Sequence, residues 1–502
     1  MAERITRVLA RCILAVMGAL LLGLAVCSLF LTCAVDSSVT SETVRLGSAG
    51  YTGIFASVLT LLLQLGLVRF FGRYRHKASL VCMLLWSTTC LIFVLGIGIQ
   101  QRYDYEAVTE ASRLFALGNY KMMHADYLNA VSYQLGIILP MEILARLFPR
   151  LSLNLLMQAA NVLFTLSITA LLLLLCSRFF PKDDCVPAAM TLTAGCIPLM
   201  LNSVFVYSTL PMLLLILGSS LCFSNALRSS LRQCFFCALL AGAACAIKPN
   251  AYIYLVALTI CSLLSLPVLR SPWLLILPLF ALIVGFGLSQ GTVRQYELRS
   301  GVQLRPNVST RARLVMGMQQ GPAAGWYNLY IERYFPADVT PAQQTEQVSQ
   351  DLQTQLHAFA SDPASILRFY KEKLLTQTLD PTYGTIRYGQ VCEHAGPLPA
   401  LYHAVYNPQS PLHRLLLLLM KGWQCIFLFM AATGLLVSLH GKSNPDQVLL
   451  PLTSMGGLLY HMIFEAKSHY MLVYTILLLP WAALGLTLLV RHTRKRNTAK
   501  SA

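Results

Sequence analysis

The feature that most limits the fold of this chain is a series of apolar runs, each near the length that crosses a lipid bilayer. A helix needs about 20 apolar residues to cross ~30 Å of hydrocarbon, because each residue adds only about 1.5 Å. Twelve runs meet this requirement: 9–34, 51–71, 78–100, 152–177, 186–206, 209–227, 233–249, 251–269, 273–290, 415–438, 447–465 and 470–490. The sequence therefore predicts an all-α polytopic membrane protein with about 12 transmembrane helices.

Composition supports a membrane protein and disfavours a nucleic-acid-binding one. Hydrophobic residues make up 56% of the 502 and charged residues only 12%, against roughly 25% in soluble domains. The net charge of +17 comes from 38 Lys and Arg against 21 Asp and Glu. Most of this excess lies in short loops and tails between apolar runs, where it indicates membrane sidedness, so no nucleic-acid partner is expected.

Basic residues predict which loops face the cytoplasm. They follow each even-numbered run, and cytoplasmic loops are enriched in Lys and Arg. The residues concerned are Arg69, Arg73, Arg75, Lys77, Arg178, Lys182, Arg228, Arg232, Arg270, Lys442, Arg491, Arg494, Lys495 and Arg496. We therefore expect a multi-pass cell-membrane protein with both termini cytoplasmic, and we expect the run at 9–34 to be a retained first helix.

One further apolar stretch, residues 131–148, is short and contains Pro140, Glu142 and Arg146. If it crossed the membrane, the sidedness of every later loop would invert. We therefore predict a helix at the outer interface, with Glu142 and Arg146 paired at i,i+4.

The predicted topology leaves two substantial segments outside the membrane, 101–151 and 291–412. The chain is accordingly divided into two N-terminal transmembrane helices (1–77), a transmembrane core carrying the first outer loop (78–290), an extracytoplasmic loop domain (291–412), and C-terminal helices with a basic cytoplasmic tail (413–502). Helices are expected over 343–359 and 364–375, the second opened by Asp362-Pro363.

Asp104 and Glu106 are the first candidate functional residues. They open a stretch in which Val108, Ala111, Leu114 and Phe115 recur at helical spacing, and Gly118 is a natural stop. Asp104 is interpreted either as an N-cap, with Glu106 in the favourable first turn, or as a carboxylate that takes a proton from a hydroxyl nucleophile.

Two cationic sites lie at the same outer interface. Lys248, at the outer end of the seventh run, either extends toward lipid headgroups or binds an anionic group. The stretch FEAKSHY, between the last two runs, contains Glu465, Lys467, His469 and Tyr470. It is either a solvated turn or a site that binds phosphate.

The location of these candidates separates an enzyme from a transporter. Transporters place their polar residues near the membrane midplane, whereas all three candidate sites lie at the outer face. An enzyme that uses a lipid-linked donor needs polar residues where the headgroup phosphate lies.

Four stretches resemble the GT-C superfamily of membrane glycosyltransferases, in particular its protein-mannosyltransferase-like (family 39-like) bacterial branch. They are YDYEAV with LFALGNY, DYLNAVSYQLGIILPMEILARLF, VMGMQQGPAAGWYN followed by DPASILRFYKEKL, and GGLLYHMIFEAKSHYMLVY. The four stretches follow one another in the family's order, and the resemblance spans most of residues 78–490. Two positions depart from the pattern: Asn129-Ala130-Val131 lacks the usual Pro, and His469 stands where Arg is usual.

The resemblance implies transfer of a sugar, with inversion, from a polyprenyl-phosphate donor to an extracytoplasmic hydroxyl acceptor on a glycopolymer, glycolipid or protein. It implies Asp104 as the catalytic base, with Glu106 as second choice. Lys248, Lys467, His469 and Tyr470 are then the candidate contacts for the donor phosphate. Trp326 and Tyr327 either stack on a sugar or fill the core of the loop domain.

Cofactor use and two other functions stay open. Some GT-C enzymes position a divalent cation, but Asp104 and Glu106 are two residues apart and would point in different directions on a helix, so no metal site is assigned. The alternatives are a transporter or flippase of lipid-linked saccharides, and a catalytically inactive scaffold.

Overall fold

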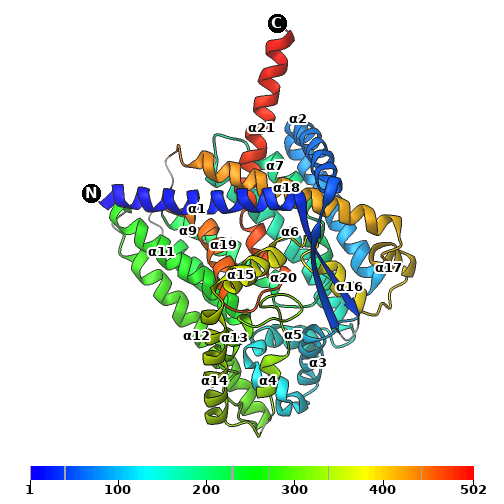
Figure 1. Cartoon of the computed structure of the whole chain (residues 1–502), viewed down its shortest axis with the longest axis vertical. Coiled ribbons are helices and arrows are strands. Elements are labelled where there is room, and N and C mark those ends of the chain that lie inside the picture. Colours follow the sequence, from blue (N-terminus) through cyan, green and yellow to red (C-terminus); the bar gives the residue numbers. More distant parts are fainter. Residues whose placement is uncertain are drawn as a thin grey trace.

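The computed structural model describes residues 2–38, 41–227, 231–269, 271–336, 338–441 and 444–501. Its apolar runs form one bundle of packed helices (Figure 1). These helices are α1 (Ala2–Phe30), α2 (Gly50–Ile97), α6 (Leu153–Phe179), α7 (Val186–Gly195), α8 (Ile197–Leu201), α9 (Thr209–Ala226), α10 (Leu231–Ile247), α11 (Tyr252–Leu269), α12 (Trp273–Ser300), α18 (Pro411–Ser438), α19 (Pro445–Ile463), α20 (Ser468–Ile476) and α21 (Leu479–Ser501). Each of the twelve predicted runs falls on one or two of them.

Seven of the helices in the described part of the chain are long and apolar enough to cross a membrane. The number rises to nine if two bent pairs each count as one span: α7 with the segment Ile197–Val204, at 60°, and α20 with α21, at 62°. The second part of α2 (Val81–Ile97) and α10 are apolar but shorter. By length and composition this is a multi-pass membrane protein, and the count of twelve spans stays a prediction.

The N-terminal region differs from the expected all-α fold. The first helix ends at Phe30 rather than at residue 34, and an antiparallel hairpin follows, made of β1 (Leu31–Ser38) and β2 (Ser41–Ser48). Thr32, Val35, Thr43 and Val44 give these segments the β-branched residues that favour strands. In Figure 1 the hairpin extends from the α1–α2 junction downward to the level of α16.

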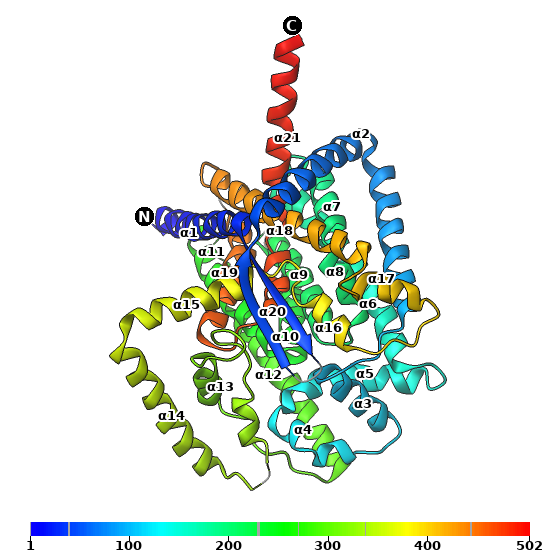
Figure 2. The ribbon, with the colours of Figure 1, turned by 45° about the vertical axis from the view of Figure 1, so that its right-hand side comes forward.

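The predicted second and third spans form one continuous helix, α2, instead of two helices joined by a loop. Figure 2 shows that α2 changes direction midway, so that its two parts run along different faces of the bundle. No proline lies between Gly50 and Ile97 to end the helix, and Arg and Lys are good helix formers.

The first predicted outer segment and the first part of the second lie together at the lower end of the molecule (Figures 1 and 2). The first contains α3 (Asp104–Ala116), η1 (Lys121–His124), α4 (Asp126–Ala130), η2 (Ser132–Gln134) and α5 (Leu135–Leu147). The second contains α13 (Thr310–Gly317), η5 (Tyr330–Tyr334), α14 (Pro341–Ser361), α15 (Pro363–Thr378), α16 (Thr385–Val391) and α17 (Pro399–Tyr406). Of these, α15, α16 and α17 lie higher, beside the bundle. The two segments share one hydrophobic cluster, and the backbone N–H of Val308 donates to the carbonyl of Ala130 at 3.2 Å.

Several local predictions for these segments are confirmed. Helix α3 buries its predicted apolar face and is followed by Gly118 in a left-handed conformation. Helices α14 and α15 lie where expected, and the Asp362 carboxylate caps α15 by accepting the N–H groups of Ala364 and Ser365. Helix α12, however, continues to Ser300, so the domain boundary predicted at residue 291 falls inside a helix.

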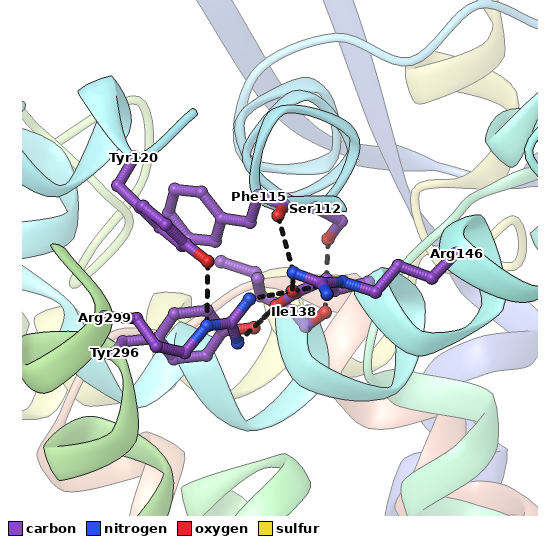
Figure 3. Close-up of polar contacts among 8 residues, drawn as sticks. Ser112, Phe115, Tyr120, Ile138, Arg146, Tyr296 and Arg299 are labelled. Carbon is purple, nitrogen blue, oxygen red and sulfur yellow. Dashed lines mark hydrogen bonds and ion pairs between the residues drawn. The ribbon is translucent and has the colours of Figure 1, made fainter. Parts of the chain in front are cut away.

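A buried ionic cluster fixes α3, α5 and α12 to one another. The predicted Glu142–Arg146 pair is confirmed, at 2.7 Å, within α5. Arg299 of α12 also pairs with Glu142, and the Tyr296 hydroxyl donates to the same carboxylate at 2.5 Å. Figure 3 shows Arg146 and Arg299 pointing toward one another from opposite sides, and Arg146 also donates to the carbonyl of Phe115 near the end of α3. The cluster therefore holds the helix that carries Asp104 in a defined position.

Candidate active site

A cavity of about 1160 Å³ lies where the outer segments meet the helix bundle. Seven of the nine candidate site residues singled out in the sequence line it: Asp104, Lys248, Tyr327, Glu465, Lys467, His469 and Tyr470. They come from four distant parts of the chain, and only the tertiary structure brings them together. The cavity lining does not include Glu106 or Trp326.

Asp104 is the first residue of α3 and faces the cavity. The N-cap interpretation is wrong, because Tyr103 occupies the cap position and no side chain caps this helix end. Tyr103 has φ of 56°, a conformation that costs a non-glycine residue on the order of 1–3 kcal/mol and is often found at functional sites. Glu106 lies in the first turn of α3, as predicted, but outside the cavity.

The surroundings of Asp104 favour its neutral form. Desolvation raises the pKa of its carboxyl group, while a hydrogen bond with Tyr127 and the charges of Lys467 and Lys248 oppose that rise. Asp104 forms no ion pair with any described residue. The cavity therefore contains a carboxylate that is not ion-paired with a described Lys, Arg or His side chain.

Lys248 lies directly after α10 and is 9% exposed. Its ammonium group donates to the Thr209 hydroxyl at 3.0 Å and lies 4.9 Å from the centre of the Tyr207 ring. Desolvation lowers its pKa to about 8, although Asp104 acts in the opposite direction. The interpretation of Lys248 as extending toward lipid headgroups is thus wrong: its charged end faces the cavity.

A glycine allows the helices around Lys248 to approach closely. A Cβ atom on Gly136, in the first turn of α5, would lie 1.9 Å from the carbonyl oxygen of Ala246 near the end of α10. Any larger residue would force α5 and α10 apart. The QLG sequence of the first outer segment therefore helps to position Lys248.

The FEAKSHY stretch joins α19 to α20 and forms one wall of the cavity. It is not a solvated turn, since the Lys467 side chain is 12% exposed and pairs with Glu465 at 3.9 Å. Desolvation raises the pKa of Glu465, and its carboxylate is hydrogen-bonded to Tyr470. His469 Nδ1 lies 3.1 Å from the Tyr388 hydroxyl.

Asp380 holds this wall in place. It is buried and accepts hydrogen bonds from the Ser468 hydroxyl at 2.6 Å and the Gly384 backbone N–H at 2.9 Å. Asp380 thus connects the loop before α16 to the first turn of α20. The positions of Lys467 and His469, on either side of Ser468, follow from this contact.

The two aromatic candidates have different surroundings. Trp326 is buried, and its indole N–H donates to the Thr376 hydroxyl at 3.1 Å, so it fills the core. Tyr327 lines the cavity, donates its hydroxyl proton to Glu332, and has Lys467 at 5.0 Å from its ring centre. Eight further tyrosines line the cavity: Tyr103, Tyr105, Tyr127, Tyr133, Tyr207, Tyr388, Tyr460 and Tyr470.

Sequence reasoning missed several charged residues of the cavity lining, among them two arginines and Glu42. Arg313 of α13 has a buried Nη2 atom without a hydrogen-bond partner, and its guanidinium lies 5.6 Å from the Tyr133 ring centre. Arg387 of α16 and Glu42 of β2 form an ion pair at 2.5 Å. Each lies in a polar stretch in which charged residues are expected to be exposed, so no sequence signal distinguishes them from surface residues.

The cavity combines a carboxylate that forms no ion pair and two cations that form none either, among the described residues. Asp104 could accept a proton, and Lys248 and Arg313 form no ion pair among the described residues, so each could stabilise negative charge on a bound group. Within the described part of the chain, no three His, Cys, Asp or Glu side chains lie close enough to hold a metal ion. Comparison with known families and with curated proteins finds no family model and no curated protein that matches the chain.

Proposed function

We propose that this protein is a GT-C-type glycosyltransferase that moves a sugar from a polyprenyl-phosphate donor to a hydroxyl acceptor outside the membrane. The acceptor hydroxyl attacks the anomeric carbon, and the bond from that carbon to the phosphate oxygen breaks. Asp104 takes the hydroxyl proton, and the polyprenyl phosphate leaves with the bonding electrons. Attack opposite the leaving group inverts the anomeric configuration.

The observation that carries the proposal is the convergence of Asp104 and Lys248 on one cavity. A general base must be free to accept a proton, and Asp104 forms no ion pair with a described residue. The leaving phosphate gains negative charge as its bond to carbon breaks, which a nearby cation stabilises. We assign Lys248, Lys467, His469 and Tyr470 to the donor phosphate and Asp104 to the base.

The tyrosines of the lining fit a carbohydrate ligand. Tyrosine offers an apolar ring face to the C–H groups of a sugar and a hydroxyl that can donate or accept a hydrogen bond. Tyr327 is the candidate sugar or acceptor contact, whereas Trp326 acts through the core.

The proposal includes a topology and its partners. We expect twelve spans, both termini in the cytoplasm and the cavity on the opposite side of the cell membrane. The polyprenyl chain of the donor would lie in the bilayer, and the acceptor would be an envelope glycopolymer, glycolipid or protein.

The test is sugar transfer from a panel of polyprenyl-phosphate sugars by the purified full chain in liposomes, with an acceptor extract supplied. Asp104→Asn should lower the transfer rate by about 10²–10⁴-fold, the usual contribution of a general base. Glu106→Gln is the matched control, because this carboxylate lies two residues away on the same helix but outside the cavity. It should leave transfer unchanged.

Other outcomes point elsewhere. Transfer that survives in Asp104→Asn, with donor binding intact, would move the base to Glu106 or elsewhere. If the wild type transfers no sugar but moves lipid-linked saccharides between leaflets, the flippase alternative replaces the enzyme. If it does neither, yet Asp104→Asn impairs assembly with partners, the protein is a scaffold.

A further inference from the structure

The β-hairpin connects the N-terminal helices to the cavity. Figure 2 shows it extending from the α1–α2 junction past α20 to the level of α16. The Cys33 backbone N–H donates to the carbonyl of Leu379 at 3.0 Å, and Val35 and Val44 pack against a small cluster that contains Trp326. These contacts place β2 along the cavity wall.

Glu42 of β2 faces two cations within the cavity. One carboxylate oxygen, Oε1, lies 2.5 Å from Arg387 Nη2 and 3.4 Å from Lys467 Nζ. The three side chains are only 15%, 7% and 12% exposed, so the group is nearly enclosed by protein. An ion pair in such surroundings is screened far less than one on the surface.

The pairing leaves polar atoms unsatisfied. Glu42 Oε2 and Arg387 Nε are both buried and have no hydrogen-bond partner. Guanidinium and carboxylate groups commonly form two parallel hydrogen bonds, but here Arg387 Nε and Glu42 Oε2 form none. A phosphate group has three terminal oxygens and could engage Arg387 Nε, Arg387 Nη2 and Lys467 Nζ together.

We propose that Arg387 and Lys467 form an anion-binding site whose internal occupant is the Glu42 carboxylate, and that a phosphate group displaces Glu42 when it binds. The hairpin then competes with the ligand for these cations. The choice of a lipid-linked phosphate as ligand rests on the proposed function; the site itself does not.

The opposite role for Glu42 makes the opposite prediction. If the carboxylate only holds the two cations in place, its removal would disorder them and weaken anion binding. If it competes with the ligand, its removal would strengthen anion binding. The sign of one measurement therefore separates the two roles.

The experiment measures binding of farnesyl phosphate and of inorganic phosphate to the purified full chain in detergent, with no acceptor present. Glu42→Gln removes a competing charge and should lower the Kd of the preferred ligand by about tenfold. Arg387→Gln removes a binding charge and should raise that Kd by at least about tenfold. Glu393→Gln is the control, since this carboxylate pairs with Arg102 outside the cavity lining and is 73% exposed. It should change neither Kd.

The two ligands distinguish the source of the phosphate. A gain confined to farnesyl phosphate identifies a lipid headgroup, and an equal gain for inorganic phosphate identifies a free phosphate. Weaker or unchanged binding in Glu42→Gln overturns the inference. The proposed function survives that result if Asp104→Asn still loses transfer. Tighter phosphate binding by Glu42→Gln, in a protein that transfers no sugar, would support the anion site and contradict the proposed function.

A measurement on the wild type guards against misfolding of the variants. Hydrogen exchange of peptides that cover β2 should accelerate when the phosphate ligand binds, because displaced Glu42 no longer holds the hairpin to α16. Exchange that stays unchanged or slows at saturating ligand would contradict displacement.

Discussion

At the scale of single residues, Asp104 and Lys248 have pKa values displaced toward neutrality from opposite directions. Desolvation raises the pKa of Asp104 and lowers that of Lys248 to about 8. Strongly shifted pKa values of this kind are frequent at functional sites, where burial and nearby charges act on the reacting groups. The pKa shifts of Asp104 and Lys248 support the proposed site because both residues also line the same cavity.

These shifts predict a bell-shaped pH profile of transfer. The base works only when Asp104 is deprotonated, so the rate should rise with pH through a pKa above the ordinary carboxyl value of 3.8. Lys248 is charged only below its pKa, so the rate should fall above about pH 8. Initial rates across the pH range in which the protein stays folded check both limbs.

Lys248→Arg tests the alkaline limb directly. A guanidinium keeps its charge throughout this range, so the fall above about pH 8 should disappear while some transfer remains. Lys248→Met should reduce transfer at every pH, because no cation replaces the lysine. An unchanged alkaline limb in Lys248→Arg would assign that limb to another group.

At the scale of elements, the position of α3 depends on the cluster around Glu142. This carboxylate is 2% exposed and neutralises Arg299 and Arg146 from two different helices. Burial alone would raise its pKa, but the hydrogen bonds from Arg299 and Tyr296 outweigh burial and lower the pKa below its ordinary value of 4.5. The cluster therefore contributes stability above that ordinary value and loses it as the pH falls through the lowered pKa.

Glu142→Gln should destabilise the protein by roughly 2–3 kcal/mol, below the 3–5 kcal/mol of a fully buried pair because Arg146 is half exposed. Thermal unfolding in detergent at neutral pH measures the loss. Glu110→Gln is the control: its carboxylate pairs with Arg113 on the exposed face of α3 and should contribute less than about 0.5 kcal/mol. Equal effects of the two changes would show that the buried cluster does not hold α3.

At the scale of the whole molecule, the two outer segments and the apolar bundle enclose the cavity together. The outer segments share a hydrophobic cluster, and Ser132 donates its backbone N–H to the Asn307 carboxamide oxygen at 2.7 Å. Because these contacts join the two segments, we expect the parts of 101–151 and 291–412 that pack together to lie on the same side of the membrane.

Cysteine labelling tests that sidedness. In a variant with exposed Cys12 replaced by Ser, a cysteine at Leu367 should react with an impermeant thiol reagent from outside intact cells. A cysteine at Arg73 should react only after the cells are permeabilised. Both positions are exposed, whereas Trp326 is too buried to report. Labelling of Leu367→Cys from the cytoplasm alone would reverse the topology and remove the proposed function.

Local sequence patterns were sufficient for much of the helical structure. Helix α3, the Asp362 cap and the Glu142–Arg146 pair depend on residues within about one or two turns of each other, so spacing predicts them. The hairpin was missed because the first residues of β1, 31–34, continue the apolar run of α1 without a break in composition. The continuous α2 was missed because basic residues indicate sidedness but do not end a helix.

The sequence by itself determined that this is a multi-pass, mostly helical membrane protein, and it singled out seven of the polar residues that line the cavity. Hydropathy and spacing are properties of neighbouring residues, and they need no knowledge of distant ones. Only the tertiary structure separated Asp104 from Glu106, placed Lys248 in the cavity and brought Glu42 to Arg387. These outcomes depend on which side of a helix faces the cavity and on contacts between distant segments, and both are decided by packing.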